Sequence, residues 1–403
     1  MTRLLRDTLE DWAGEARVPH DLADRALGGR RRRWVLPAGV GVLAAGVAVA
    51  VTVAVSGLGV DHRQAPVRPA TGVTLPARPS PAPTDVRTDI GNRPPRKLIA
   101  AGSVAVSAYW TSVMEKLPGN EERLRRTWWL YDPKTDGYEK TSWAWVDVAP
   151  GLQTAAAIQG DGLGRRIVVL DTNTREVLSS IGLEHDAGSV VWSPDGTKLL
   201  VTTYSAYPDL WQKTEDSLVQ KRNQGLRTGY YVIDVATGEK EYHELPSLND
   251  LERGEPGNAN PRQDFGWSLD GSLVWGPTTT TPDRVFYTQD GERHEPPHSD
   301  RYIRQTGRSA VSPDGRLVLG RDGLPTKITE VATGAVAGRQ KVLRLLAWAD
   351  DDNVIALGCA GECDDEFDNG LVLVSVDGSR TTQLAATGKS EGAGSWRWVL
   401  TPR

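Results

Sequence analysis

The stretch Trp192-Ser193-Pro194-Asp195-Gly196 predicts a tight turn between two β-strands. Proline presets φ at the first corner of such a turn, aspartate accepts hydrogen bonds from nearby backbone amides, and glycine adopts the positive φ that closes the turn. Residues 189–192 before the turn and 197–201 after it have the aliphatic and β-branched bias of buried strands. The sequence therefore predicts a strand, a turn and a second strand here.

Weaker copies of this unit recur at Trp267-Ser-Leu-Asp-Gly271, Val311-Ser-Pro-Asp-Gly315 and Trp348-Ala-Asp-Asp-Asp352. A second set of polar turns lies at 171–175, 234–238, 330–334 and 376–379, and each turn follows an apolar run. The repeated positions are about 37 to 75 residues apart, against roughly 40 to 50 for one four-stranded blade of a β-propeller. We therefore predict an all-β propeller of about six four-stranded blades, closed by pairing of its first and last strands. The long interval from Trp192 to Trp267 has room for a seventh blade.

The residues expected to build the repeated turns are Trp192, Pro194, Asp195, Gly196, Trp267, Asp270, Gly271, Pro313, Asp314, Gly315 and Trp348. The W-S-P-D-G pattern, together with D-x-x-T-G turns, resembles the TolB-type, WD40-like propeller repeat of bacterial proteins over about Leu98 to Arg403. The resemblance implies the fold rather than one function, because such propellers serve as binding platforms, as lyases and as gating domains of peptidases. The abundance of Ala, Gly, Arg and Val, with few Lys and Met, also resembles actinobacterial proteins.

An uncharged apolar run within residues 34–60 is long enough to cross a bilayer, which takes about 20 residues in a helix. Four arginines immediately precede the run, so the positive-inside rule leaves residues 1–33 in the cytoplasm. Residues 61–97 are rich in Pro, Ala, Arg and Thr and lack the apolar clusters that a folded domain needs. We therefore predict a single-pass cell-membrane protein with a cytoplasmic amphipathic tail (1–33), a transmembrane helix (34–60), a Pro-rich disordered linker (61–97) and an extracytoplasmic propeller (98–403).

A cleaved signal peptide is the competing interpretation of residues 34–60. The segment Val53-Ala-Val-Ser-Gly57 offers small residues for cleavage, and the arginine run with Trp34 loosely resembles a twin-arginine export signal. In both interpretations the propeller leaves the cytoplasm. The layout of helical tail, span and outer domain also resembles membrane-bound anti-sigma regulators, which gives a second alternative function, although the tail lacks the cysteines of their zinc motif.

The charge distribution argues against nucleic acid as a partner. Residues 98–403 contain 32 basic and 43 acidic side chains, whereas phosphate binding needs a basic face. The loops and central channel of an exported propeller are free to recognise a protein, peptide or glycan of the cell envelope. We therefore predict a non-enzymatic binding or scaffold protein whose partners are the membrane and such an envelope molecule, with no cofactor.

One motif suggests catalysis but fails on physical grounds. The segment His294-Glu-Pro-Pro-His298 matches the H-E-x-x-H pattern of zinc proteases, which requires both histidines on one face of a helix. Two adjacent prolines prevent that helix, and the sequence has no G-x-S-x-G motif for a serine nucleophile. We predict no catalytic, cofactor-binding or metal-binding residue. The alternative is a lyase or glycosidase of the channel, which would gather four histidines at one mouth: His185, His243, His294 and His298.

Cys359 and Cys363 are the only cysteines, and we predict that they form a disulfide. An exported domain meets an oxidising compartment, and the two side chains can face each other across the short loop between them. The acidic residues that follow could supply oxygen ligands to calcium, but Gly370 lies one position later than an EF-type loop requires. We therefore interpret residues 364–369 as a solvated acidic turn.

Overall fold

The computed structural model describes residues 74–77, 82–213, 218–220, 227–244, 262–277, 284–304, 307–320, 325–361, 363, 368–389 and 395–403. All of them belong to one compact unit, Gln64–Arg403. They form antiparallel sheets and a short 3-10 helix, η1 (His298–Tyr302). The central strands are aliphatic and aromatic, as in the buried segment Leu199–Val201, because such side chains pack well on a pleated surface.

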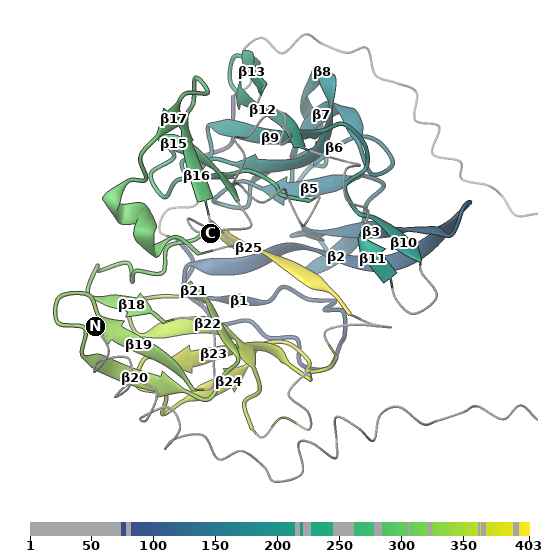
Figure 1. Ribbon diagram of the computed structural model, residues 1–403. Coiled ribbons are helices and arrows are strands. Elements are labelled where there is room, and N and C mark those ends of the chain that lie inside the picture. The colour runs from purple at the N-terminus through teal and green to yellow at the C-terminus, as the bar shows by residue number, and fades with distance from the viewer. Residues whose placement is uncertain are drawn as a thin grey trace, which may run out of the picture. The chain divides into compact units, whose positions relative to one another are not determined.

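The first sheet joins the two ends of the propeller. Its blade-forming strands are β1 (Ala100–Ala101), β2 (Val104–Leu117), β3 (Glu121–Asp132), β4 (Gly137–Lys140) and β25 (Arg397–Pro402). The C-terminal strand β25, yellow in Figure 1, pairs antiparallel with β2, from Val104 opposite Pro402 to Trp110 opposite Arg397. The predicted closure between the first and last parts of the propeller is therefore present.

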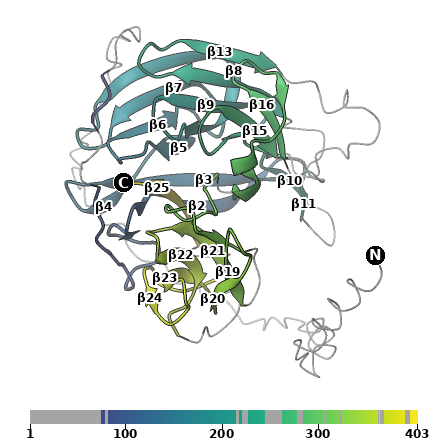
Figure 2. The same cartoon turned by 90° about the vertical axis from the view of Figure 1, so that its left-hand side faces the viewer.

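The second sheet has seven strands in the order of the chain, labelled in Figure 2 except for β12, which Figure 1 labels: β5 (Trp145–Val148), β6 (Thr154–Ile158), β7 (Gly164–Asp171), β8 (Val177–Trp192), β9 (Lys198–Tyr204), β12 (Arg227–Asp234) and β13 (Lys240–Glu244). The long strand β8 has two partners. Its part from Val177 to Ala187 pairs with β7, and its part from Ala187 to Trp192 pairs with β9. One strand thus ends one group of strands and begins the next.

Three smaller sheets complete the described fold. One has four strands: β14 (Gly266–Trp267), β15 (Leu273–Pro277), β16 (Arg284–Thr288) and β17 (Arg293–His294). One has three strands: β18 (Leu317–Leu319), β19 (Thr326–Glu330) and β20 (Val336–Gln340). The last has four: β21 (Arg344–Trp348), β22 (Asn353–Gly358), β23 (Gly370–Ser375) and β24 (Thr381–Gln383).

These sheets confirm the all-β propeller class. Four of the five have at least the four strands of a propeller blade. About four blades are thus separate as sheets, fewer than the six that the repeat spacing predicts. The interval in which the sequence allowed a seventh blade contains a hairpin, β10 (Leu210–Lys213) and β11 (Leu218–Gln220), that extends the first sheet by pairing with β3.

The segment before Leu98 packs against the propeller, which extends the folded region into residues that the sequence assigns to the linker. The Asp89 amide donates to Leu384 O, and the Asp89 carboxylate accepts the amides of Arg96 and Lys97 at 2.6 and 3.0 Å. Asp85 forms an ion pair of 2.9 Å with Arg403, at the end of β25. Individual polar contacts hold this segment in place, and composition alone does not reveal them.

The predicted tail (1–33) and transmembrane helix (34–60) lie outside the described residues. Within the part of the chain that the structure describes, no helix is long and apolar enough to span a membrane.

Candidate functional site

The predicted turn residues occupy equivalent connections. The turns join β8 to β9, β14 to β15 and β21 to β22, and the turn at 312–316 leads into β18. In the first turn, Ser193 Oγ donates to Asp195 and accepts the amide of Lys198 at 2.9 Å. The same serine geometry recurs at Ser268 and Ser312. The glycines that close these turns have φ of 74°, 75° and 77°: Gly196, Gly271 and Gly315.

The three tryptophans of these units are buried at the start of their turns. Trp267 Nε1 donates to Val191 O at 3.3 Å, and Trp348 Nε1 donates to Ala310 O at 2.9 Å. Each acceptor belongs to the unit before the tryptophan, so the indole connects neighbouring units. Trp192 is equally buried, but its Nε1 has no acceptor among the described residues.

The first polar contact of the candidate site joins Trp192, at the end of β8, to Asp147, on the edge strand β5. Ser193 N bonds to Lys198 O in the ladder between β8 and β9. Hydrogen-bonded pairs alternate along an antiparallel ladder, so the Trp192 amide points away from β9 toward the free edge of β8. There it donates to Asp147 Oδ2 at 2.8 Å. Asp147 lies on β5, the first strand of its sheet, and we call the edge of a sheet at its first strand the inner edge.

Asp147 has a pKa close to neutrality. Burial raises the pKa of its carboxyl to about 6, and the Trp192 and Val148 amides and the positive charge of Arg308 only partly oppose this rise. No second carboxylate of the described residues is among the groups that shift its pKa. A carboxyl in this state can accept hydrogen bonds and exchange a proton near pH 6.

Arg308 is the positive group that interacts with Asp147. It stands just before Ser309, which pairs with Ile303, and its carbonyl accepts the amide of Arg304 at 2.8 Å. Burial lowers the pKa of the Arg308 guanidinium to about 10, against the attraction of Asp147. The residue is partly exposed, and its guanidinium has no hydrogen-bond acceptor among the described residues. The charges of Asp147 and Arg308 therefore attract each other, although the two side chains do not form a direct ion pair.

A second polar group, the arginine–aspartate cluster, consists of Arg126, Asp209, Arg262 and Asp264. Arg126 holds Asp209 through two bonds of 2.5 and 3.1 Å, and Arg262 Nε lies 2.6 Å from the same carboxylate. Burial opposes ionisation of Asp209, but the two guanidinium groups hold its pKa below the ordinary value. The guanidinium carbon of Arg262 lies over the Trp145 ring, 4.9 Å from the ring centroid. The charges of this cluster are mutually neutralised, which indicates a structural role.

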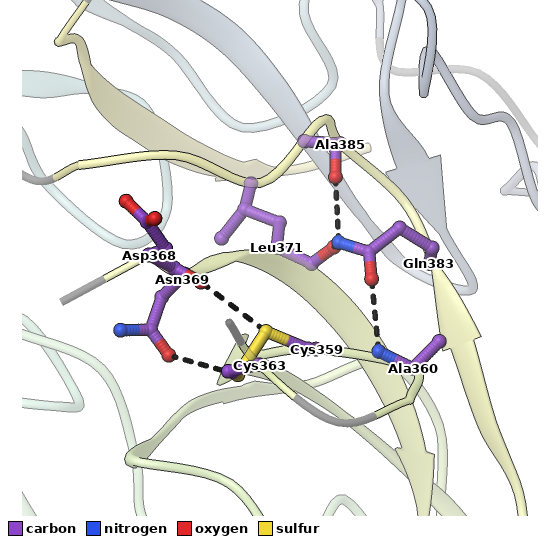
Figure 3. Close-up of a disulfide and its surroundings, with 8 residues drawn as sticks. All are labelled: Cys359, Ala360, Cys363, Asp368, Asn369, Leu371, Gln383 and Ala385. Atoms are coloured by element: carbon purple, nitrogen blue, oxygen red, sulfur yellow. Dashed lines mark hydrogen bonds between the residues drawn. A yellow bond between two sulfur atoms is a disulfide. The ribbon is translucent and has the colours of Figure 1, made fainter. Parts of the chain in front are cut away.

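The predicted disulfide partners are bonded in the structure (Figure 3). The Cys359 and Cys363 sulfurs are 2.06 Å apart, and Cys359 Sγ lies 3.2 Å from Asp368 O. Gln383 braces the same loop, because its Oε1 accepts the Ala360 amide at 2.9 Å and its Nε2 donates to Ala385 O at 2.6 Å. A pocket of about 340 Å³ lies beside the disulfide. Residues 364–367 of the predicted acidic turn lie outside the described part.

The four histidines considered for catalysis do not gather at the inner edge. His294 lies on the outer strand β17 and His298 begins η1, so the two do not share one helical face. His243 lies on the outer strand β13. His185 stacks on Tyr242 of β13, with ring centroids 3.9 Å apart. Within the described ranges, no group of three or more His, Cys, Asp or Glu side chains could hold a metal ion.

Asp147, Arg308 and the arginine–aspartate cluster were not among the residues singled out from the sequence. Asp147 lies on β5 and Arg308 lies in the segment before Ser309, far away in the chain, and neither lies in a motif. The serine of each W-S-P-D-G unit could have been found from the sequence, because a serine follows the first residue of the unit in three copies: Ser193, Ser268 and Ser312. The recurrence of this serine is the signal that identifies the side chain whose hydroxyl holds the turn.

No family model and no curated protein matches the chain. Many solved structures are similar to it. TolB from Acinetobacter baumannii is 14% identical over 75% of this chain and 68% of its own, with a TM-score of 0.37. The Kuenenia stuttgartiensis hydrazine synthase is 11% identical over 60% of this chain and 66% of its own, with a TM-score of 0.31. The Myceliophteria thermophila Cps50 (Swd1) propeller domain is 11% identical over 75% of this chain and 89% of its own, with a TM-score of 0.36. These likenesses are too distant to carry weight, so we base the propeller class on the strand pairing.

Proposed function

We propose that the chain is a non-enzymatic binding propeller, anchored in the cell membrane by residues 34–60 and facing the outside of the cell. The placement of the polar side chains is the observation that supports binding over catalysis. Four histidines lie away from the inner edge, and among the described residues no second carboxyl contributes to the pKa shift of Asp147. A glycosidase uses two carboxyl groups on either side of the bond it cleaves.

The proposed ring has six blades. Division of the second sheet at Ala187 of β8 gives two groups of four strands, and the β25–β2–β3–β4 group of the first sheet gives another. The three-stranded sheet gains a fourth member from Val311, which bridges Val318. With the two four-stranded sheets, this makes six units, and each has the size of a propeller blade.

The proposed partner is a protein or peptide of the cell envelope, bound at the central channel or the loops around it. The experiment is affinity capture with the full-length chain, purified in detergent and immobilised, from solubilised envelope fractions. We expect capture of a discrete partner, and added free chain should compete with the immobilised chain for that partner. A chain that captures nothing from envelope fractions, but converts an envelope glycan to products, would overturn the proposal in favour of a lyase or glycosidase.

A further inference from the structure

The hairpin formed by β2 and β3 continues beyond the point where β25 stops. The strand β25 pairs with one edge of β2 from Val104 to Trp110, and β3 pairs with the opposite edge as far as Leu117. Residues 111–117 of β2 therefore have β3 on one edge and, among the described residues, no strand on the other. We call this second edge of residues 111–117 the open edge.

The opposite edge of the same hairpin is covered. The strand β10 pairs through residues 210–212 with residues 121–123 of β3. Beyond these pairs, the Leu124 amide donates to Asp209 O at 3.0 Å, and the Tyr207 hydroxyl donates to Leu124 O at 2.7 Å. Figure 1 shows β10 and β11 beside β3. The fold thus protects one edge of the hairpin and leaves the other available to a further strand.

The open edge is apolar, whereas exposed edges are usually short or charged. The outermost strands of the other sheets, β13, β17, β20 and β24, have only two to five residues. In the open edge, Val113 and Met114 are 56% and 38% exposed. Successive side chains of a strand point to opposite faces of the sheet, so each face of the open edge has an exposed apolar side chain. Such an edge binds an extended segment through its backbone and the segment's apolar side chains.

The charges on the hairpin determine which polar side chain suits an added strand. Glu115 already pairs with Arg123 at 2.7 Å and with Arg125 at 3.7 Å. Lys116 is exposed and has no ion pair with any residue that the structure describes. The open edge therefore offers two apolar positions and one positive charge.

The length of the open edge favours a peptide segment over a second copy of the chain. A stable protein interface has about 20 to 30 residues on each side, whereas the open edge comprises only residues 111–117. One added strand, typically about 5 to 6 residues long, would continue the line of β25 along β2. We infer that the open edge binds an extended segment of a partner protein as an antiparallel strand, with aliphatic side chains opposite Val113 and Met114 and an acidic side chain opposite Lys116. This inference rests on the proposed binding function and names the surface and the segment that is recognised.

The test measures binding of labelled heptapeptides to the full-length chain by fluorescence anisotropy. The parent peptide has blocked ends, Glu at its second position, Val at its fourth and fifth positions and Thr elsewhere. An antiparallel strand then places Glu opposite Lys116 and the two Val opposite Met114 and Val113. Two further peptides have N-methyl groups on the odd-numbered or on the even-numbered amides.

The methylated peptides distinguish strand addition from binding by side chains alone. Only alternate backbone groups of an antiparallel strand face a given neighbour. One methylated peptide should therefore bind about as tightly as the parent peptide, and the other should bind at least 10-fold more weakly. Equal binding of the two methylated peptides, or no binding of the parent peptide, would overturn the inference.

Matched variants locate the site. Val113→Lys should weaken binding of the parent peptide at least 10-fold, because it places a charge at an apolar position. Val336→Lys should leave binding unchanged, because Val336 is 47% exposed on β20 in another sheet. Lys116→Glu should bind a peptide with Lys in place of Glu more tightly than the parent peptide. Equal binding of the parent peptide to Val113→Lys and to the unaltered chain would contradict the open edge as the site.

Hydrogen exchange needs no variant and therefore does not depend on how Val113→Lys folds. The parent peptide should slow exchange of the amides of residues 111–117 at least several-fold and leave residues 336–340 unchanged. Slow exchange of residues 111–117 that appears as the concentration of the chain alone rises would show that a second copy occupies the edge, against the inference. If the chain captures an envelope partner but the parent peptide gives no protection, strand addition fails while the binding function stands. Protection by the peptide without capture of a partner would count against the proposed function alone.

Discussion

The indole N–H of Trp348 donates a hydrogen bond of 2.9 Å to the backbone carbonyl of Ala310. Ala310 lies in the segment that precedes β18, and Trp348 ends β21, so the bond joins the inner parts of two consecutive units. Trp267 makes the same kind of bond to Val191. The repeated tryptophan therefore packs as a core side chain and also fixes the distance between neighbouring units.

The contribution of this bond can be separated from packing with two matched variants. Trp348→Phe should lower the free energy of unfolding by about 1 to 2 kcal/mol more than Trp192→Phe, because it leaves a buried carbonyl without its donor. Both changes remove the same volume from a buried site, but Trp192 Nε1 has no acceptor to lose within the described ranges. Chemical denaturation of both variants measures the difference. Equal losses would show that the bond contributes nothing beyond packing.

Asp147 should make stability depend on pH. Its pKa is raised from 3.8 to about 6 in the folded chain, so the folded state binds the proton more tightly than the unfolded state. Ionisation therefore costs stability as pH rises from about 4 to 6, and the full cost remains above pH 6. Asp147→Asn should raise stability at pH 7.5 by on the order of 1 to 2 kcal/mol and change little at pH 4. Thermal melts at both pH values check this, and a variant destabilised equally at both would contradict it.

The arginine–aspartate cluster should be sensitive to loss of its central charge. Asp209→Asn leaves two buried guanidinium groups facing a neutral amide, which should cost about 3 to 5 kcal/mol. Asp186→Asn is the control, because solvent screens the exposed Asp186–Arg165 pair and its loss should change stability little. Urea titration of both variants measures the two costs. A small effect at Asp209 would mean that the cluster is not a structural element.

Cys359 and Cys363 should be oxidised to a disulfide in the mature protein. A thiol count on the denatured, unreduced chain should find no free thiol, and two titratable thiols would refute the prediction. The loop between the cysteines is short, with a sequence separation of 4. Cys359→Ser should therefore cost only about 1 to 2 kcal/mol and leave the fold intact.

The predicted topology is tested on intact protoplasts. Added protease should remove the propeller, because residues 98–403 are expected outside the membrane. Survival of the propeller would overturn this orientation. Recovery of a soluble form that begins near Ser56 would show a cleaved signal peptide in place of an anchor.

The repeated turns were predictable because their chemistry is local. Proline, aspartate and glycine act within a few residues of one another, so Asp195 and Gly196 carry the same information in the sequence as in the fold. Asp147 and Arg308 could not be found in this way, since they lie far apart in the chain and their charges interact only in the folded structure. The start of the fold was missed for a similar reason: Asp89 stands in a Pro-rich segment, and its partners Leu384 and Lys97 are visible only in three dimensions.

The pairing of β25 with β2 also sets an order of events during synthesis. The β2 strand leaves the ribosome early, but the strand that covers its free edge comes from the other end of the propeller. Until residues 397–402 are available, this edge presents unpaired amides and carbonyls that can recruit a foreign strand. A nascent chain therefore depends on protection of β2 until translation reaches β25, and premature termination before Arg397 would yield a sticky, aggregation-prone product.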